Sequence, residues 1–156
     1  MRLLLQRVSR AEVRVSGETA GRIGNGIVAL VGVGHGDTPD VARQMARRTA
    51  ELRIFADDEG RTNRSLLDVH GEVLAVSQFT LYADTSRGRR PSFLRAAPPD
   101  LGERLYRVYA DELETLGVGV GRGVFGARMD VELTNEGPFT IWLDSAAGRD
   151  ESDPRA

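Results

Sequence analysis

Two short segments of the chain carry residue types that could do chemistry. Ser77-Gln78-Phe79-Thr80 places three hydrogen-bonding side chains in four residues, directly after the apolar run from 73 to 76. Strand ends are common positions for functional residues, and backbone N–H groups there can hold a developing oxyanion. Asn135-Glu136-Gly137-Pro138 has the composition of a turn. Each segment also has a plainer explanation, as a solvent-facing strand edge and as an ordinary turn with a trans proline.

The side chains that usually carry hydrolytic chemistry are scarce. The chain has no cysteine, which excludes disulfides, thiolate nucleophiles and thiolate zinc sites. His35 and His70 each occur beside glycine without a supporting motif, so we interpret them as solvated loop residues. The acidic run 57–59 has no further ligand pattern around it and predicts a solvated turn instead of a metal site. We therefore expect no metal and no cofactor, and any hydrolysis must rely on backbone donors, hydroxyls and the substrate's own groups.

Size and charge narrow the class of protein. A length of 156 residues suits one domain with one core. The formal net charge of -2 argues against bulk nonspecific binding of nucleic acid but permits a local basic patch. All 21 basic residues are arginine, which either a GC-rich genome or selection for bidentate phosphate contacts explains. We expect a soluble, cytoplasmic protein in a reducing compartment, with neither a signal peptide nor a membrane span.

Apolar periodicity predicts the elements that would position these segments in the first half of the chain. The continuous apolar run 26–33 predicts a central strand that is buried on both faces. Thr38 and Pro39 predict the cap and first turn of a helix that ends near Leu52. Residues 57–64 form a polar loop. The other predicted strands cover residues 3–8, 11–15, a short segment ending near Ile23, 53–55 and 72–76, and the last of these delivers Ser77–Thr80.

The second half predicts one helix and two strands. Pro98-Pro99-Asp100 opens a helix whose apolar stripe runs from Leu101 to Leu116. The glycine-rich stretch 117–126 predicts a loop, and it is no phosphate cradle because it follows a helix instead of opening one. Strands at 129–133 and 139–143 flank the turn and predict an antiparallel pair. The sum is a single α/β domain over 1–144 with much antiparallel sheet and two main helices, followed by a disordered tail over 145–156.

Several separated motifs together resemble the D-aminoacyl-tRNA deacylase family. They occur in the family's order over residues 1–144, which makes the resemblance specific. Phe139 departs from it, because the family usually has valine there, but Gly137, Pro138 and Thr140 are in place. The motifs are Gln6-Arg7-Val8, Arg53-Ile54-Phe55, Ser77-Gln78-Phe79-Thr80-Leu81-Tyr82-Ala83-Asp84, Arg90-Pro91-Ser92-Phe93, Gly123-Val124-Phe125-Gly126-Ala127-Arg128-Met129 and Asn135-Glu136-Gly137-Pro138-Phe139-Thr140.

The resemblance implies a fold, an assembly and an activity. The fold would be a largely antiparallel, barrel-like core with two helices, and the protein would be a homodimer. It would hydrolyse the ester between a D-amino acid and the tRNA 3′ end, and would remove glycine from some tRNAs, as a proofreading step. Gly137 and Pro138 would form a cis peptide that enters the partner's pocket, where their carbonyl oxygens would exclude an L side chain. Arg7 would fix this turn through bonds to carbonyls, its plainer role being a surface arginine on a strand.

The resemblance also implies cleavage without a base from the protein. The ribose 2′-hydroxyl of the terminal adenosine would assist, and the protein would orient the ester. Ser77 and Gln78 would shape the pocket, while the amides of Phe79 and Thr80 would hold the developing charge. Thr80 as a covalent nucleophile is an alternative, although nothing in the sequence would deprotonate it. The pair Phe125 and Met129 would pack against the adenine, or else belong to the core.

The sequence is compatible with more than one mode of substrate contact and more than one function. Arg87, Arg89 and Arg90 form a basic stretch that would contact tRNA phosphates or simply be a solvated loop. A noncatalytic module of the same fold that binds structured RNA is one alternative function. A hydrolase of small esters that acts without tRNA is the other.

Overall fold

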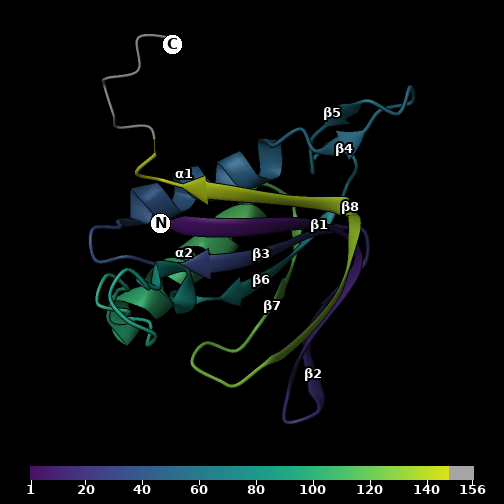
Figure 1. Ribbon diagram of the computed structural model, residues 1–156. Helices are drawn as coiled ribbons and strands as arrows, with labels where there is room; N and C mark the ends of the chain where they lie inside the picture. Colours follow the sequence, from purple (N-terminus) through teal and green to yellow (C-terminus); the bar gives the residue numbers. More distant parts are fainter. Residues whose placement is uncertain (148–156) are drawn as a thin grey trace, which may run out of the picture.

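Two long strands, β1 (Arg2–Val15) and β8 (Asp130–Asp144), pair antiparallel along most of their length and frame the molecule (Figure 1). This computed structural model describes residues 1–147. Of the predicted tail, residues 148–156 lie outside the described residues. Residues 145–147 form a turn in which the Ser145 amide donates to the Met1 carbonyl over 2.9 Å.

Six of the strands in the described residues form one mixed sheet in the order β2-β1-β3-β6-β7, with β8 on the other edge of β1. The predicted single α/β domain with a barrel-like core is confirmed; β1 pairs antiparallel with its three neighbours, while β3–β6 and β6–β7 are parallel. The remaining strands of this sheet are β2 (Glu18–Ile23), β3 (Gly26–Gly32), β6 (Glu72–Ser77) and β7 (Gly119–Arg122).

The sheet curls until its first and last strands nearly meet. Gly21 on β2 lies against the backbone of β7, and a Cβ at this position would be 2.8 Å from the Arg122 amide nitrogen. A Cβ on Gly121 of β7 would in turn be 3.2 Å from the Arg22 carbonyl oxygen. Glycine on both strands thus permits the close backbone approach that almost closes the barrel.

Both faces of the central strands are buried, as the continuous apolar run 26–33 predicts. Alternate residues of β3 face two cores: Ile27, Ala29 and Val31 pack in one and Val28 in the other. The first core also takes the buried faces of α1 (Pro39–Glu51) and α2 (Pro99–Thr115), which lie together against one face of the sheet (Figure 1). The second fills the inside of the curled sheet.

Local capping signals fix where the helices begin and end. The Thr38 side chain accepts from the Val41 amide over 3.3 Å and Pro39 begins the first turn of α1, as predicted. After α2, Gly117 adopts a φ of +86°, the left-handed conformation that stops a helix. No helix within residues 1–147 has the length and apolar character needed to cross a bilayer.

The predicted hairpin around 135–138 is wrong. Residues 130–144 form a single strand, and both halves pair with β1 instead of with each other. Val8 pairs with Asn135 and Gln6 pairs with Thr140, so Arg7 alone lies opposite the residues from 136 to 139. We call these four residues the 136–139 excursion. Proline has no N–H for the ladder, which is why the pairing is interrupted and then resumes.

Three smaller predictions also need correction. The stretch 117–126, predicted as a loop, contains strand β7, whose glycines hid it from the apolar pattern. The predicted strand 53–55 and loop 57–64 form instead a small hairpin of β4 (Phe55–Ala56) and β5 (Thr62–Arg64). The two predicted strands 3–8 and 11–15 are the single strand β1.

Candidate active site

A cavity of about 590 Å³ opens at the C-terminal ends of the parallel strands β3 and β6, beside the first turns of α2. Its wall is mostly apolar, with a few polar groups at the strand ends, as is usual for small-molecule sites. Residues from five segments line it: Val31, Val33, Val76, Ser77, Gln78, Phe79, Phe93, Ala96, Ala97, Pro99, Gly102, Tyr106, Phe125, Gly126, Ala127, Met129 and Val131.

The polar segment after β6 forms one rim of this cavity. Ser77 and Gln78 end the strand, and the Gln78 amide donates to the Val31 carbonyl over 2.7 Å. The chain then turns into the short 3-10 helix η1 (Phe79–Tyr82). The backbone amides of Phe79 and Thr80 begin this helix and find no acceptor among residues 1–147. They are therefore free to bind an external oxygen.

Thr80 does not line the cavity. Its side chain is exposed, and its hydroxyl oxygen accepts a hydrogen bond from the Gln78 side-chain amide. A carboxamide N–H is a donor and cannot take the proton of a hydroxyl. Within residues 1–147, the Thr80 hydroxyl has no hydrogen bond to a base of the kind that activates a covalent nucleophile.

Phe125 and Met129 both lie in the cavity wall, and each also packs against one of the two apolar cores. The Phe125 ring is half-buried beside Tyr106 of α2, with 6.2 Å between the ring centroids. Tyr106 is almost fully buried, and its hydroxyl donates to the Ala75 carbonyl over 2.8 Å. Burial raises the pKa of Tyr106 to about 12, so the hydroxyl is a neutral donor at physiological pH.

Three residues that shape the cavity, Phe93, Gly102 and Tyr106, were not among the predicted site residues. Gly102 faces Phe125 from α2, and a Cβ there would lie 3.3 Å from the tip of that ring. Phe93 packs edge-on against Phe79, with 5.0 Å between centroids. Phe93 belongs to one of the quoted motifs, but Gly102 and Tyr106 carry no local signal, because a helix position that faces a cavity looks like any other buried position.

Gly137 and Pro138 do not reach the cavity of their own chain. Both are exposed at the tip of the 136–139 excursion, and their peptide bond is cis. Gly137 has a φ of +122°, which an L side chain rarely adopts. The structure therefore separates the predicted site residues into two groups, one lining the cavity and one on the excursion.

Arg7 supports the excursion from the opposite strand. Its side chain is 13% exposed and its guanidinium lies 4.8 Å from the centroid of the Phe139 ring. The Arg7 Nε is 3.6 Å from the Glu136 carboxylate, and its Nη1 donates to the Ile54 carbonyl. The carbonyl that Arg7 binds is thus that of Ile54, whereas carbonyls of the turn were expected. Phe139, the departure from the family, serves as a cation–π partner of this arginine.

Asn135 ties the base of the excursion together. Its side-chain oxygen accepts from the Phe139 amide over 3.0 Å, and its side-chain nitrogen donates to the Thr140 hydroxyl over 2.9 Å. These two bonds bridge the point where the chain leaves and rejoins the β1 ladder. The excursion is therefore held at its base by the side chain of Asn135 and from the opposite strand by that of Arg7.

The remaining candidate groups lie away from the cavity. His35 contacts the Leu94 carbonyl over 3.0 Å. Asp57 accepts hydrogen bonds from the Arg61 and Glu59 amides, and the Arg61 bond is the main reason why the pKa of Asp57 lies below its usual value. Arg64 pairs with Asp58 over 2.7 Å. Within residues 1–147 no three histidine or carboxylate side chains converge in a metal-binding arrangement.

The arginine-rich loop lies next to the cavity rim. Arg87, Arg89 and Arg90 are exposed and form no ion pair with a carboxylate of the described residues. The loop is closed by a pair of hydrogen bonds between Asp84 and Ser92, and it leads directly to Phe93 in the cavity wall. These free guanidinium groups can meet phosphates near the site.

Comparison with known sequences matches nearly the whole chain. The family model described as D-Tyr-tRNA(Tyr) deacylase matches residues 4–144. A D-aminoacyl-tRNA deacylase of Roseiflexus castenholzii is 59% identical over 150 residues, covering 96% of this chain and 96% of that protein. The D-aminoacyl-tRNA deacylase of Deinococcus radiodurans is 53% identical over 144 residues, covering 92% of this chain and 99% of that protein.

Two solved structures share the fold. A c-Myc DNA unwinding element binding protein superposes with a TM-score of 0.86 at 37% identity, covering 92% of this chain and 98% of that one. A probable eukaryotic D-amino acid tRNA deacylase superposes with a TM-score of 0.80 at 21% identity, covering 91% of this chain and 97% of that one.

Proposed function

This chain belongs to the D-aminoacyl-tRNA deacylase family, and we propose that it hydrolyses the ester bond between a D-amino acid and the 3′ end of tRNA. The observation that carries the proposal is the cavity whose rim holds Phe79, because the amides of Phe79 and of the next residue, Thr80, have no acceptors among the described residues. The products would be free tRNA and a free amino acid. The reaction would remove wrongly charged tRNA in the cytoplasm, where charged tRNA is used.

Cleavage would depend on positioning, with the nucleophilic assistance supplied by the substrate. An aminoacyl ester is already activated. The neighbouring ribose 2′-hydroxyl of the terminal adenosine would assist its hydrolysis, either by positioning the attacking water or by hydrogen bonding to the ester carbonyl. The amides of Phe79 and Thr80 would stabilise the negative charge that develops on the carbonyl oxygen. Phe125 and Met129 would hold the adenine against the apolar wall, so that the ester lies at the rim.

Selection against L-aminoacyl-tRNA would come from a second copy of the chain. Gly137 and Pro138 are exposed on a supported excursion and lie outside their own cavity, so a partner's cavity is the place they would fill. Their carbonyl oxygens would clash with an L side chain, whereas a D side chain would point away. Glycine has no side chain to exclude, so glycyl-tRNA would also be hydrolysed.

The tRNA itself would be bound next to the cavity. Arg87, Arg89 and Arg90 are free of carboxylate partners among the described residues and border the rim through Phe93. Phosphate contacts made by these arginines would give an affinity that falls steeply with salt.

The activity is tested by incubating the protein with D-Tyr-tRNA, L-Tyr-tRNA and Gly-tRNA. We expect D-Tyr-tRNA and Gly-tRNA to be hydrolysed rapidly, while L-Tyr-tRNA stays intact. Equal hydrolysis of the D and L esters, or of neither, would overturn chiral proofreading. Salt-dependent tRNA binding without cleavage would support a noncatalytic RNA-binding module, and turnover of free amino-acid esters without tRNA would support a small-ester hydrolase.

The shared site has its own test, which uses the absence of natural cysteine. Ala127→Cys in the cavity wall combined with Glu136→Cys on the excursion should give a disulfide-linked dimer under mild oxidation. The matched control combines Glu136→Cys with Arg107→Cys, which lies on an exposed face of α2. Equal cross-linking of both double variants would contradict insertion of the excursion into a partner's cavity.

A further inference from the structure

The rim of the cavity rests on a short element that has little internal support. The 3-10 helix η1 holds itself with hydrogen bonds such as Leu81 N–H to the Gln78 carbonyl at 3.3 Å and Ala83 N–H to the Thr80 carbonyl at 2.9 Å. Phe79 at its start is 57% exposed. A single 3-10 turn has poor hydrogen-bond geometry, so its position depends on what holds its far end.

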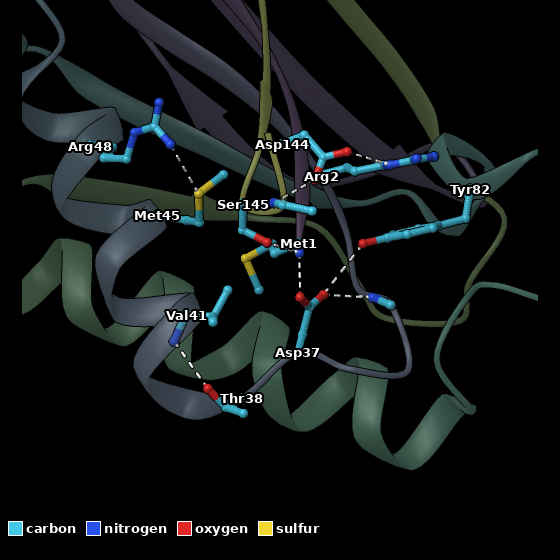
Figure 2. Close-up of polar contacts among 12 residues, drawn as sticks. Met1, Arg2, Asp37, Thr38, Val41, Met45, Arg48, Tyr82, Asp144 and Ser145 are labelled. Atoms are coloured by element: carbon cyan, nitrogen blue, oxygen red, sulfur yellow. Dashed lines mark hydrogen bonds and ion pairs between the residues drawn. The ribbon is translucent and has the colours of Figure 1, made fainter. Parts of the chain in front are cut away.

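Arg2 is the side chain that holds that far end. Its Nη1 donates to the Leu81 carbonyl over 3.0 Å, and its guanidinium lies 4.6 Å from the centroid of the Tyr82 ring. Figure 2 shows the two side chains extending alongside each other, with the Tyr82 hydroxyl directed towards Asp37. Arg2 therefore contacts both of the last two residues of η1.

Arg2 is itself oriented by the end of β8. Its Nε donates to the Asp144 carboxylate over 3.0 Å, and the two residues are paired in the β1–β8 register (Figure 2). The guanidinium also lies 5.6 Å from the centroid of Trp142. Burial disfavours the carboxylate, but the Ala146 amide and the Arg2 guanidinium outweigh it and keep the pKa of Asp144 below its usual value. The planar fork of arginine donates to a carboxylate and a carbonyl in a fixed geometry, which the flexible ammonium group of lysine does not reproduce.

We propose that Arg2 is a positioning residue for ester hydrolysis, because it fixes η1, and with it the Phe79 and Thr80 amides, at the rim of the cavity. This inference rests on the proposed function for its kinetic consequence, but its structural consequence stands alone. Without the bond to Leu81 and the contact with Tyr82, η1 loses part of its support on the side remote from β6, where the Tyr82 hydroxyl also bonds to Asp37 over 3.5 Å. The amides would then spend less time in the geometry that stabilises the oxyanion.

The test compares Arg2→Met, Arg2→Lys and a control, Arg43→Met, whose native partner is Asp40 on α1 at 2.8 Å. Hydrogen exchange should show faster exchange of the Leu81 and Ala83 amides in Arg2→Met, with protection elsewhere in the sheet unchanged. The emission of Trp142, the single tryptophan, should also shift. Arg2→Lys should fall between Arg2→Met and the wild type, and Arg43→Met should match the wild type.

Kinetics on D-Tyr-tRNA provide the second readout. We expect kcat of Arg2→Met to fall by about 10-fold to 100-fold with KM almost unchanged, which is the range that small misplacement of a catalytic group produces. If Arg2→Met does not fold, Arg2→Lys decides the question with the same measurements. Wild-type exchange at Leu81 and Ala83 in the Arg2 variants would overturn the proposal. If the wild-type protein has no deacylase activity, the proposed function is wrong. The hydrogen-exchange measurement would still show whether Arg2 fixes the position of η1.

Discussion

Thr80 offers two chemistries at one residue, a hydroxyl and a backbone amide, and the structure favours the amide. The hydroxyl is exposed and receives a hydrogen bond from Gln78, whereas the amide has no acceptor among residues 1–147. Thr80→Ala should therefore keep kcat on D-Tyr-tRNA within about 10-fold of the wild type, because the amide is retained. Loss of a true nucleophile costs about a thousand-fold or more. A drop of that size with intact tRNA binding, reversed in Thr80→Ser, would restore the covalent mechanism.

Gly102 gives a second residue-scale prediction, in which stability and affinity change in opposite directions. Alanine is favoured over glycine in a helix by about 1 kcal/mol, so Gly102→Ala should raise the free energy of unfolding by up to that amount. The new Cβ would lie 3.3 Å from the Phe125 ring, which sits in a loop and can shift into the cavity. KM for D-Tyr-tRNA should therefore rise.

The check on Gly102 is a double variant. Phe125→Leu in the Gly102→Ala background removes the ring that the new methyl group displaces. Urea unfolding and KM are measured for the single and double variants. If Gly102→Ala destabilises the protein, or if KM stays at the wild-type value, the loop around Phe125 does not move as we describe.

At the scale of elements, the contact between β3 and β6 depends on a glycine. Gly26 lies beside Glu72 in the parallel ladder, and a Cβ there would be 1.9 Å from the Glu72 carbonyl oxygen. Gly26→Ala should lower the free energy of unfolding by about 3 kcal/mol, because buried backbone must separate. Gly36→Ala is the matched control, since a Cβ at that loop position meets nothing within 4 Å. Equal urea midpoints for the two variants would contradict this account.

The elements that local chemistry determines were predictable from the sequence, and those set by distant pairing were not. Thr38 and Pro39 mark the start of α1, and the apolar run 26–33 marks β3, because the signals lie within each segment. The composition of 135–138 indicates a turn whether the chain reverses or only leaves its ladder. Which of the two occurs depends on pairing with β1. Asn135 pairs with Val8 of that strand, which lies more than 120 residues earlier in the chain.

The candidate site divides in the same way. Ser77, Gln78, Phe79, Phe125 and Met129 were found because they belong to motifs, and the structure brings them around one cavity. Gly102 and Tyr106 were not found, because only their place on α2 opposite Phe125 gives them a role. The relation that we propose between the excursion and a second chain's cavity is one that no single-chain pattern encodes.

At the scale of the whole molecule, the three tyrosines give a pH prediction. Tyr82, Tyr106 and Tyr109 are all buried, and burial raises the pKa of each, that of Tyr106 to about 12. Between about pH 10 and pH 12 the unfolded chain loses tyrosine protons that the folded chain keeps. The free energy of unfolding should therefore fall as pH rises through this range.

Absorbance at 295 nm measures this directly. The native protein should show almost no tyrosinate at pH 10, and its tyrosines should ionise together with alkaline unfolding followed by circular dichroism. The same chain in guanidinium chloride should titrate near pH 10 and serves as the reference. A native titration that coincides with the denatured one would show that these hydroxyls reach solvent.

The pairing of β1 with β8 also decides when, during synthesis, the protein becomes complete. The ribosome makes β1 at residues 2–15 and β8 only at residues 130–144, so one edge of β1 waits for its partner through most of translation. The strands and helices around the cavity can assemble on the nascent chain, but the excursion, its support by Arg7 and the Arg2–Asp144 pair all arrive with β8. A ribosome-bound chain that stops before residue 130 would lack the excursion and Val131 of the cavity wall, and it would have an open strand edge prone to aggregation.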